Sequence, residues 1–338
     1  MRRPTLLVSS LAVSALLLPM GAAGAVDSDQ TEVPAPTCLG IQVTILGTAG
    51  NDQLTGTPGP DVIDGQAGND TIVGLDGADR ICGGLGTDLV SYADHEAPVT
   101  ADLTGGLGDD GSDEDGPEGA RDSIAKDVEG VTGGYGNDVL TGNSSANAIS
   151  GGPGEDQLSG GVGNDVVHGD SGDDLLRGQE GADEIWGDAG DDLVYGGGGA
   201  DHLLGGAGGD YFSGGGDPDQ VSYDDGQHST GVNASLGGTP GGDGNRADGP
   251  AGERDTITNS VEDLNGSPYD DVLTGNAEDN AIAGDNGKDT MLGLAGTDYL
   301  FAVDGERDTK IDCGADADFG AARDAVDPSA TSCTAAAS

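Results

Sequence analysis

The feature of this chain that most restricts its fold is a nine-residue repeat, Gly-Gly-x-Gly-x-Asp-x-U-x, in which U is a large apolar residue. One complete copy runs from Gly160 to His168. Further units open, without a change of register, at Gly169, Gly178, Gly187, Gly196, Gly205 and Gly214. A short fixed period predicts stacked units that contact only their neighbours, rather than a globular core.

The repeat units fall into three arrays separated by two interruptions. We place the arrays at residues 47–91, 133–222 and 266–310. The third array degenerates near its end, where Arg307 occupies the place of the repeated Asp. The interruptions cover residues 92–132 and 223–265.

The two interruptions resemble each other. Asp122-Ser123-Ile124 in the first corresponds to Asp255-Thr256-Ile257 in the second, about 130 residues later, which indicates duplication of a larger module. We expect each interruption to add a few longer strands to the stack. We also expect each to project a loop rich in Gly and Asp, such as residues 105–119.

Each unit has a large apolar residue at position 8, for example Leu158 and Leu176. Positions 7 to 9 predict a three-residue strand whose middle side chain points inward, and the glycine-rich remainder predicts a turn. Two units then form one coil, so that units n and n+2 lie one above the other at about 4.8 Å. The expected fold is all-β, with two sheets of short strands.

Position 6 is an Asp in nearly every unit, so the stacked turns bring carboxylates together in a column. Carboxylates about 4.8 Å apart repel one another strongly unless cations lie between them. Carboxylate and carbonyl oxygens in a flexible loop suit calcium better than magnesium or zinc. The alternative is that each Asp only caps its turn, but this does not explain the regular spacing together with a net charge of −50.

We therefore expect multiple Ca²⁺ ions as the cofactor, with the position-6 aspartates as their ligands. Asn147 and Asn280 occupy position 6 in the second unit of their arrays, where we expect weaker or absent sites. If the arrays act separately, sites between units n and n+2 number about three, eight and two along the chain. The candidate ligands are Asp52, Asp61, Asp70, Asp79, Asp88, Asp138, Asp156, Asp165, Asp174, Asp183, Asp192, Asp201, Asp210, Asp219, Asp271, Asp289 and Asp298.

With these residues the chain resembles the RTX family of haemolysin-type calcium-binding nonapeptide repeats, over most of residues 47–301. The resemblance implies a parallel β-roll, a right-handed β-solenoid with calcium in the turns. Family members often add a protease, lipase or pore-forming domain and use an uncleaved C-terminal export signal. This chain instead has an N-terminal signal and no room for a separate catalytic domain, so we do not transfer those activities to it.

The composition limits both the fold and the partners. Acidic residues number 62 against 12 basic ones, and aromatic residues make up only 3% of the chain. Such a chain has too little apolar bulk for an ordinary core, so without calcium we expect it to be mostly disordered. Nucleic acid and anionic membrane surfaces are poor partners for so acidic a surface, and we expect no membrane span.

The N-terminus has the features of a cleavable export signal, which we place at residues 1–25. Arg2 and Arg3 precede an apolar run from Leu6 to Leu18, and Ala23-Gly24-Ala25 provides a cleavage site. The apolar run is too short for a membrane anchor. The sequence therefore predicts an extracellular protein.

The flanks of the repeat region are the expected caps over the open ends of the stack, at residues 26–46 and 311–338. Within the first flank, residues 41–45 alternate like a strand. Four cysteines in an exported protein suggest disulfides. We expect Cys38–Cys82 and Cys313–Cys333 because each pair lies at one end of the repeats. A metal–thiolate site is the weaker alternative because no Cys-x-x-Cys occurs.

No catalytic motif is evident, and we expect no enzyme activity. Neither His-Glu-x-x-His nor Gly-x-Ser-x-Gly occurs. His168 and His202 are expected on the surface, roughly 10 Å apart and too far to share one metal ion. His95 and His228 lie in the interruptions. Two outward pairs can touch across adjacent layers, as ordinary surface cover or as a patch for a partner, namely Trp186 with Leu204 and Arg177 with Tyr195.

Together these features predict a secreted β-roll protein that folds on binding several calcium ions, with a structural or surface-associated role. Two alternatives remain open. The chain could be an adhesin or accessory module that binds a protein or glycan at the cell surface, or it could be the non-catalytic companion of a secreted hydrolase.

Overall fold

The computed structural model describes residues 35–245, 248–249, 254–314, 320–323 and 326–333. The chain divides into two units, Met1–Ala35 and Pro36–Ser338, and the description that follows concerns the second. The expected signal peptide lies outside the described residues. The described part of the chain contains no helix that could cross a membrane.

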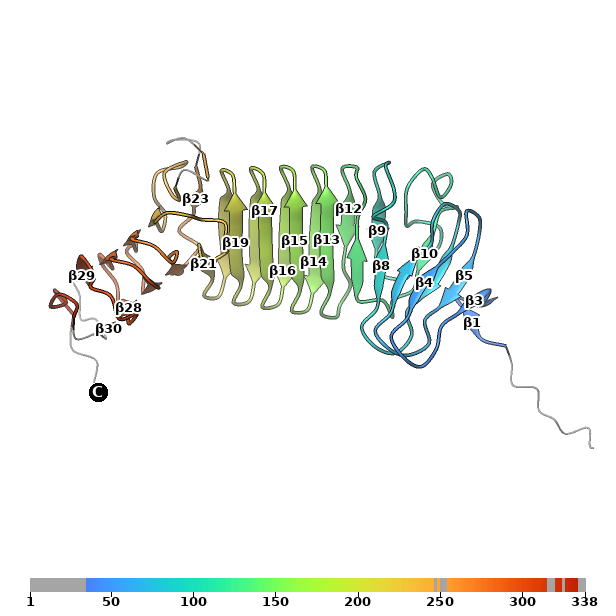
Figure 1. The fold of residues 1–338 in the computed structure, drawn as a ribbon, viewed down its shortest axis with the longest axis horizontal. Coiled ribbons are helices and arrows are strands. Elements are labelled where there is room, and N and C mark those ends of the chain that lie inside the picture. Colours follow the sequence, from blue (N-terminus) through green and yellow to red (C-terminus); the bar gives the residue numbers. More distant parts are fainter. Residues whose placement is uncertain (1–34, 246–247, 250–253, 315–319, 324–325, 334–338) are drawn as a thin grey trace, which may run out of the picture. The chain divides into compact units, whose positions relative to one another are not determined.

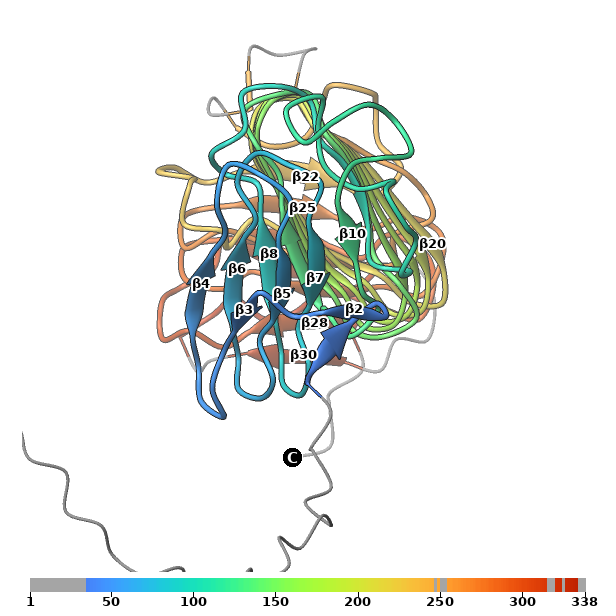
Figure 2. The same cartoon turned by 90° about the vertical axis from the view of Figure 1, so that its right-hand side faces the viewer.

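The described residues form stacked coils of parallel β-strands, which confirms the expected all-β solenoid. Leu158 pairs with Leu176 and Val167 pairs with Ile185, so each strand lies beside the strand one full coil further along the chain. The strands of the second array, green to yellow in Figure 1, lie side by side. Seen at 90° in Figure 2, their coils overlie one another.

One face of the solenoid is a single 13-stranded sheet that continues through all three arrays. Its strands are β4 (Gln53–Thr55), β6 (Thr71–Val73), β8 (Leu89–Ser91), β11 (Gly130–Thr132), β13 (Ala148–Pro153), β15 (Val166–Ser171), β17 (Glu184–Ala189), β19 (His202–Ala207), β21 (Gln220–Ser222), β24 (Asp263–Asn265), β26 (Ala281–Ala283), β28 (Tyr299–Ala302) and β30 (Gly320–Arg323).

The opposite face is divided into sheets of four, seven and four strands. The first sheet contains β3 (Ile45–Leu46), β5 (Val62–Asp64), β7 (Arg80–Cys82) and β10 (Ser123–Ile124). The second contains β9 (Thr100–Asp102), β12 (Val139–Thr141), β14 (Gln157–Val162), β16 (Leu175–Glu180), β18 (Leu193–Gly198), β20 (Tyr211–Gly216) and β23 (Thr256–Ile257). The third contains β22 (Asn233–Ser235), β25 (Val272–Thr274), β27 (Thr290–Leu292) and β29 (Lys310–Asp312).

The interruptions cause these divisions: the 13-stranded sheet runs through both of them, whereas the opposite face starts a new sheet at each. On the divided face, a repeat unit supplies one strand, whereas the first interruption supplies two, β9 and β10. Strand β9 pairs with β12 and begins a new sheet, whereas β10 pairs with β7 and ends the preceding one. In the second interruption, β22 and β23 do the same with β25 and β20. The four strands are two or three residues long, not longer than those of the repeats as expected.

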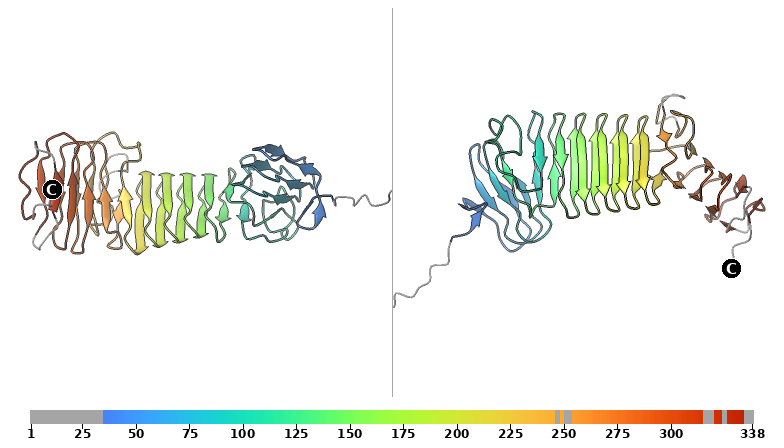
Figure 3. Two further views of the ribbon diagram at one scale, coloured as in Figure 1. Left: turned by 90° about the horizontal axis from the view of Figure 1, so that it is seen from below. Right: turned by 180° about the vertical axis from the view of Figure 1, so that it is seen from behind.

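Strand length also differs between the arrays. The expected three-residue strands occur in the first array, but strands such as β14 and β16 in the second array have six residues. There the ladder continues past position 9 into the next unit, with Gly161 opposite Gln179 and Val162 opposite Glu180. The view from behind in Figure 3 shows these longer strands.

The core is a column of position-8 side chains, as the repeat predicts. Leu140, Leu158, Leu176 and Val194 are fully buried, and their equivalents in the other arrays join the same cluster. Leu54 is only partly buried because it lies in the first strand of the 13-stranded sheet. One apolar residue per unit is therefore enough to build the core, because stacking buries each of these side chains against the units above and below.

Both expected disulfides are present, Cys38–Cys82 and Cys313–Cys333, with Cα–Cα distances of 5.7 and 5.1 Å. The expected single strand over residues 41–45 is instead broken. Strand β1 (Thr37–Cys38) pairs antiparallel with β2 (Ile41–Gln42), and β3 then starts the first parallel sheet. The first disulfide therefore fixes the β1–β2 hairpin to β7.

Substitution of Gly172 by Ala tests the turn geometry. Gly172, at position 4 of its unit, has φ +136°, and a Cβ there would lie 1.4 Å from the Gly154 carbonyl oxygen. We expect Gly172→Ala to lower the thermal unfolding temperature in excess calcium, because left-handed geometry alone costs Ala about 1–2 kcal/mol. Gly50 is the matched control, since a Cβ at this other position-4 glycine meets no atom within 4 Å. Equal effects of Gly172→Ala and Gly50→Ala would contradict this account.

Candidate metal centre

The position-6 aspartates line the turns between the two faces, and each caps the backbone one coil earlier. The Asp174 amide donates to Asp192 Oδ1 at 2.8 Å, and the Asp192 amide donates to Asp210 Oδ1 at 2.9 Å. Asp192 is fully buried and Asp210 is 1% exposed. The repeated Asp is therefore a structural residue of the turn, and the same geometry stacks the carboxylates of successive coils.

The second carboxylate oxygen, Oδ2, either accepts a hydrogen bond from the amide of position 2 or has no hydrogen-bond partner. We call the carboxylate closed in the first case and open in the second. In the first unit of the second array the position-2 amide closes it, since the Gly134 amide donates to Asp138 Oδ2 at 2.6 Å. The same bond from position 2 closes Asp52, Asp61 and Asp271, which also lie in the first one or two units of their arrays.

In the later units position 2 has a left-handed backbone, and its amide does not bond the carboxylate. Residues other than glycine adopt this conformation there, including Asp170 with φ 69° and Gln179 with φ 81°. The Oδ2 atom is then buried and has no hydrogen-bond partner in three units of the first array and eight of the second. These open carboxylates are Asp70, Asp79, Asp88, Asp156, Asp165, Asp174, Asp183, Asp192, Asp201, Asp210 and Asp219.

Most open carboxylates face a backbone carbonyl across the space above the position-1 glycine. A Cβ on Gly187 would lie 2.4 Å from Asp192 Oδ2 and 2.6 Å from the Gly205 carbonyl oxygen. The glycine therefore leaves a gap lined by oxygen atoms. Buried polar atoms are normally satisfied, and oxygen atoms from carboxylates and carbonyls are the ligands that calcium prefers. The residues present fit a hard divalent cation.

Burial sets the electrostatics of the column. Burial, together with the charges of neighbouring aspartates, raises the pKa of Asp156 to about 6, of Asp174 to about 7 and of Asp192 to about 8. A cation among the carboxylates favours their ionised form and opposes this shift.

The columns include acidic residues that the repeat pattern did not identify. The Asp79 amide donates to Asp122 Oδ1 at 2.8 Å, and the Asp88 amide donates to Glu129 Oε2 at 3.0 Å. Asp255 and Glu262 bind Asp210 and Asp219 in the same way in the second interruption. The matching Asp-Ser-Ile and Asp-Thr-Ile segments were the available signal, but no nine-residue spacing leads to them.

The third array does not fail at Arg307 as expected. The chain contains one extra residue there, and Asp308 takes the place of the repeated Asp, accepting from the Asp289 amide at 2.9 Å. The Asp308 amide in turn donates to Asp327 Oδ1 at 3.2 Å. A strict nine-residue count places Arg307 in this position, whereas the backbone accommodates the insertion.

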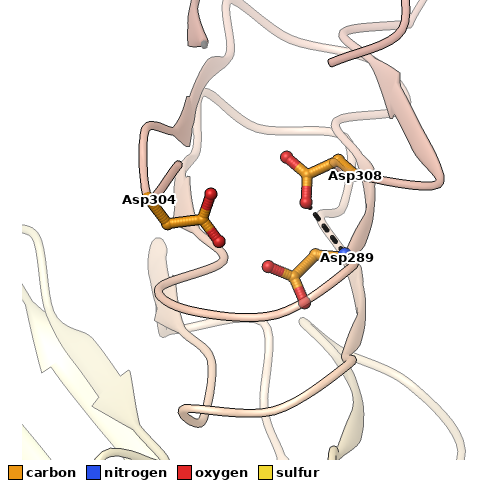
Figure 4. A group of neighbouring side chains, drawn as sticks. All are labelled: Asp289, Asp304 and Asp308. Carbon is orange, nitrogen blue, oxygen red and sulfur yellow. Dashed lines mark hydrogen bonds between the residues drawn. The ribbon is translucent and has the colours of Figure 1, made fainter. Parts of the chain in front are cut away.

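Three carboxylates converge at this end of the chain. Oxygen atoms of Asp289, Asp304 and Asp308 all lie within 4.8 Å of one another. Figure 4 shows Asp304 facing the other two side chains across a common space. Burial, followed by the charges of Asp271, Asp308 and Asp304, raises the pKa of Asp289 to about 8. This group has the donor set of a cation site.

The two Asn residues at position 6 have a specific local cause. Asn147 Nδ2 donates to the Glu129 carbonyl at 3.1 Å, and its Oδ1 accepts from the Asn143 amide at 2.7 Å. Asn280 makes the equivalent bond to the Glu262 carbonyl at 3.0 Å. A glutamate one coil earlier presents a carbonyl at this point, to which an Asn amide donates and a carboxylate cannot.

The histidines and aromatic residues divide into surface and buried groups. His168 and His202 are partly exposed and lie two strands apart in the 13-stranded sheet. Trp186 stacks on His168 with 5.6 Å between ring centroids, and Arg177 lies 5.9 Å from the Tyr195 ring centroid. In contrast, His95 and His228 are buried, at 1% and 5% exposure, which the sequence did not indicate.

The Asn147→Asp variant tests this account of the Asn positions. The new carboxylate would face the Glu129 carbonyl without a donor, which costs about 1–3 kcal/mol for a buried group. We expect a lower unfolding temperature in excess calcium and no additional bound ion, measured by thermal unfolding and titration calorimetry. A gain of one calcium ion with equal or higher stability would show instead that Asn147 merely lacks a ligand.

The pH dependence of the metal-free chain tests the electrostatics. The open aspartates bind protons more tightly in the folded than in the unfolded chain, whose aspartates keep a pKa near 3.8. The folded state therefore retains more protons between pH 4 and about 8, and its stability falls as pH rises through this range. We expect circular dichroism of metal-free protein to show more β structure at pH 4.5 than at pH 8. A metal-free β signal that rises with pH would contradict the shifts.

Comparison with known proteins agrees with this geometry. The model of the RTX calcium-binding nonapeptide repeat matches residues 44–65, 55–90, 132–167, 168–203, 186–221 and 265–300. No curated protein matches the chain. The matched segments together make up half of the sequence and lie in all three arrays. The chain belongs to the RTX calcium-binding nonapeptide repeat family, and it is a calcium-binding β-roll.

Proposed function

We propose that this protein is exported, that its open aspartates hold calcium between successive coils, and that calcium binding drives its folding outside the cell in a structural or surface-associated role. The observation behind this proposal is the series of buried Oδ2 atoms without a hydrogen-bond donor, three in the first array and eight in the second. These numbers equal those expected from the repeat count for ions between units n and n+2 in the same arrays.

The two carboxylate oxygens of each open aspartate have different roles in the turn. Oδ1 accepts the amide of the preceding coil and fixes the side chain, as Asp192 does for Asp174. Oδ2 and the position-1 carbonyl, such as that of Gly205, are the oxygens that would hold the ion. Calcium supplies positive charge at a site where the chain offers only oxygen donors. The net charge of −50 makes the compact state unfavourable until such charge is present.

Export and extracellular folding have separate support. The N-terminal sequence has the basic and apolar regions of a signal peptide. The disulfides Cys38–Cys82 and Cys313–Cys333 suit an oxidising compartment. Extracellular calcium sites commonly work at millimolar concentrations, so the unfolded chain could cross the membrane before it meets its ions.

The structure offers less support for a glycan-binding role. Trp186 has one neighbour on each side in its ladder, with His168 stacked on it and Leu204 paired opposite it in the next strand. A sugar ring binds best to an open aromatic face, whereas His168 already stacks on one face of Trp186. We therefore favour a structural role, in which the chain acts on no substrate itself.

Calcium-dependent folding is the direct test of this function. We expect chelated mature protein at pH 7.5 to gain a large β signal in circular dichroism when calcium is added, and much less when magnesium is added, because magnesium dehydrates reluctantly and demands a stricter geometry. An equal response to magnesium, or no response to calcium, would overturn the proposal.

A pair of variants assigns the ligands in the same experiment. Asp192→Asn removes one open carboxylate and should reduce the number of bound calcium ions measured by calorimetry. Asp76→Asn removes an equal charge from an exposed side chain and should leave that number unchanged. Equal stoichiometry in both variants would exclude Asp192 as a ligand.

A further inference from the structure

Each interruption buries a histidine between two carboxylates. His95 Nε2 lies 2.9 Å from Asp115 Oδ1, and its Nδ1 lies 3.3 Å from Asp94 Oδ1. His95 is 1% exposed, and the Asp115 side chain is fully buried. The Tyr92 ring packs edge-on against His95 with 5.1 Å between centroids.

The second interruption repeats this arrangement. His228 Nε2 lies 2.9 Å from Asp248 Oδ1, and its Nδ1 lies 3.0 Å from Asp225 Oδ1. Tyr223 packs edge-on against His228 at 5.3 Å.

The arrangement persists although the two sequences differ in length. Two extra residues separate the tyrosine from the histidine in the second copy, Tyr223 to His228, compared with Tyr92 to His95. The Nδ1 partner is nevertheless the second residue after the tyrosine in both copies. The same four groups therefore meet despite an insertion between them.

When both carboxylates are ionised, this geometry requires a charged ring. An ionised carboxylate only accepts hydrogen bonds, so a ring with a carboxylate at each nitrogen must donate from both, and only the imidazolium does so. The charges of Asp79 and Asp138 also act on His95 from the neighbouring repeats. Despite burial, the bonds and charges of Asp115 and Asp94 raise the pKa of His95 to about 9, and those of Asp225 and Asp248 raise that of His228 to about 10.

The other buried carboxylates of the first interruption already have donors on both oxygens. Asp115 Oδ2 accepts from the Ser112 amide at 2.7 Å. Asp110 accepts from the amides of Asp102 and Ile124 at 2.7 and 2.8 Å. Asp122 accepts from the Asp79 amide and from the Tyr92 hydroxyl at 2.8 and 3.1 Å. These carboxylates differ from the open aspartates of the arrays, whose Oδ2 atoms lack a donor. In the second interruption Asp225 Oδ2 is buried without a donor, so there the charge of His228 is the balancing group.

The histidines also lie where one face of the solenoid is divided. The amide-to-carboxylate series on that face reaches Asp122 and restarts at Asp138, which accepts from the Val99 amide at 2.8 Å. The same series reaches Asp255 and restarts at Asp271.

We propose that each interruption is a metal-independent joint, in which a protonated histidine supplies the positive charge that calcium supplies in the arrays. The comparison with calcium in the arrays rests on the proposed function, whereas the protonation of the histidines is independent of it. The joints divide the ion-binding column of one face into three groups, and each joint holds its loop without an ion.

Nitrogen-15 NMR of the histidine rings tests the charge directly in the full mature chain. With saturating calcium and at pH 7.5, we expect His95 and His228 to show both ring nitrogens protonated, with the variants His95→Gln and His228→Gln used only to assign the signals. A neutral tautomer at either position would overturn the proposal. The signal reports on the ring itself, so it remains readable if calcium binds elsewhere or not at all.

Removal of the Asp115 charge tests whether this carboxylate keeps His95 protonated. Asp115→Asn should lower the pKa of His95 by about 1–3 units, the usual effect of a close opposite charge. Asp109→Asn, an exposed carboxylate of the same loop, should leave that pKa unchanged. Calorimetry on Asp115→Asn should give the wild-type number of calcium ions. An unshifted His95, or the loss of one ion, would show that the joint is not neutralised by its histidine.

Discussion

The interaction on which this fold depends is the bond from a backbone amide to the aspartate one coil further along. It runs through all three arrays, for example from Asp174 to Asp192 and from Asp271 to Asp289. The bond fixes the turn, but it also buries each carboxylate close to the carboxylate of the next coil. The stability of the turns and the repulsion between them therefore have one origin, and the chain can be compact only where that charge is balanced.

The structure balances the charge in two ways. In the arrays a left-handed residue at position 2 turns its amide away and leaves Oδ2 to face a carbonyl oxygen, which suits an ion from solution. In the first interruption, protein donors satisfy both oxygens of the buried carboxylates, and in both interruptions a buried histidine, His95 or His228, provides positive charge. The position-2 backbone thus distinguishes an open turn from a closed one such as that of Asp138.

The backbone position of a residue, rather than its spacing along the sequence, decides whether it joins the column of carboxylates. Glu129 enters it with a longer side chain, and Asn147 in the next coil donates to the Glu129 carbonyl, which a carboxylate could not do. Asp308 enters it after an insertion that displaces Arg307. In each case the backbone position one coil away selects the residue, and a nine-residue count along the chain does not find Glu129 or Asp308.

The sequence by itself determined the 18-residue coil, the buried position-8 column, the parallel β-solenoid, the family and both disulfides, because each follows from a period or a pairing visible along the chain. Only the tertiary structure decided that one face stays continuous while the other divides, and that His95, Asp122 and Asp308 join the turns. Those outcomes depend on contacts between coils across insertions and loops, where no fixed spacing connects the partners. The same contacts decide which aspartates are open, because position 6 of the repeat is an Asp in open and closed turns alike.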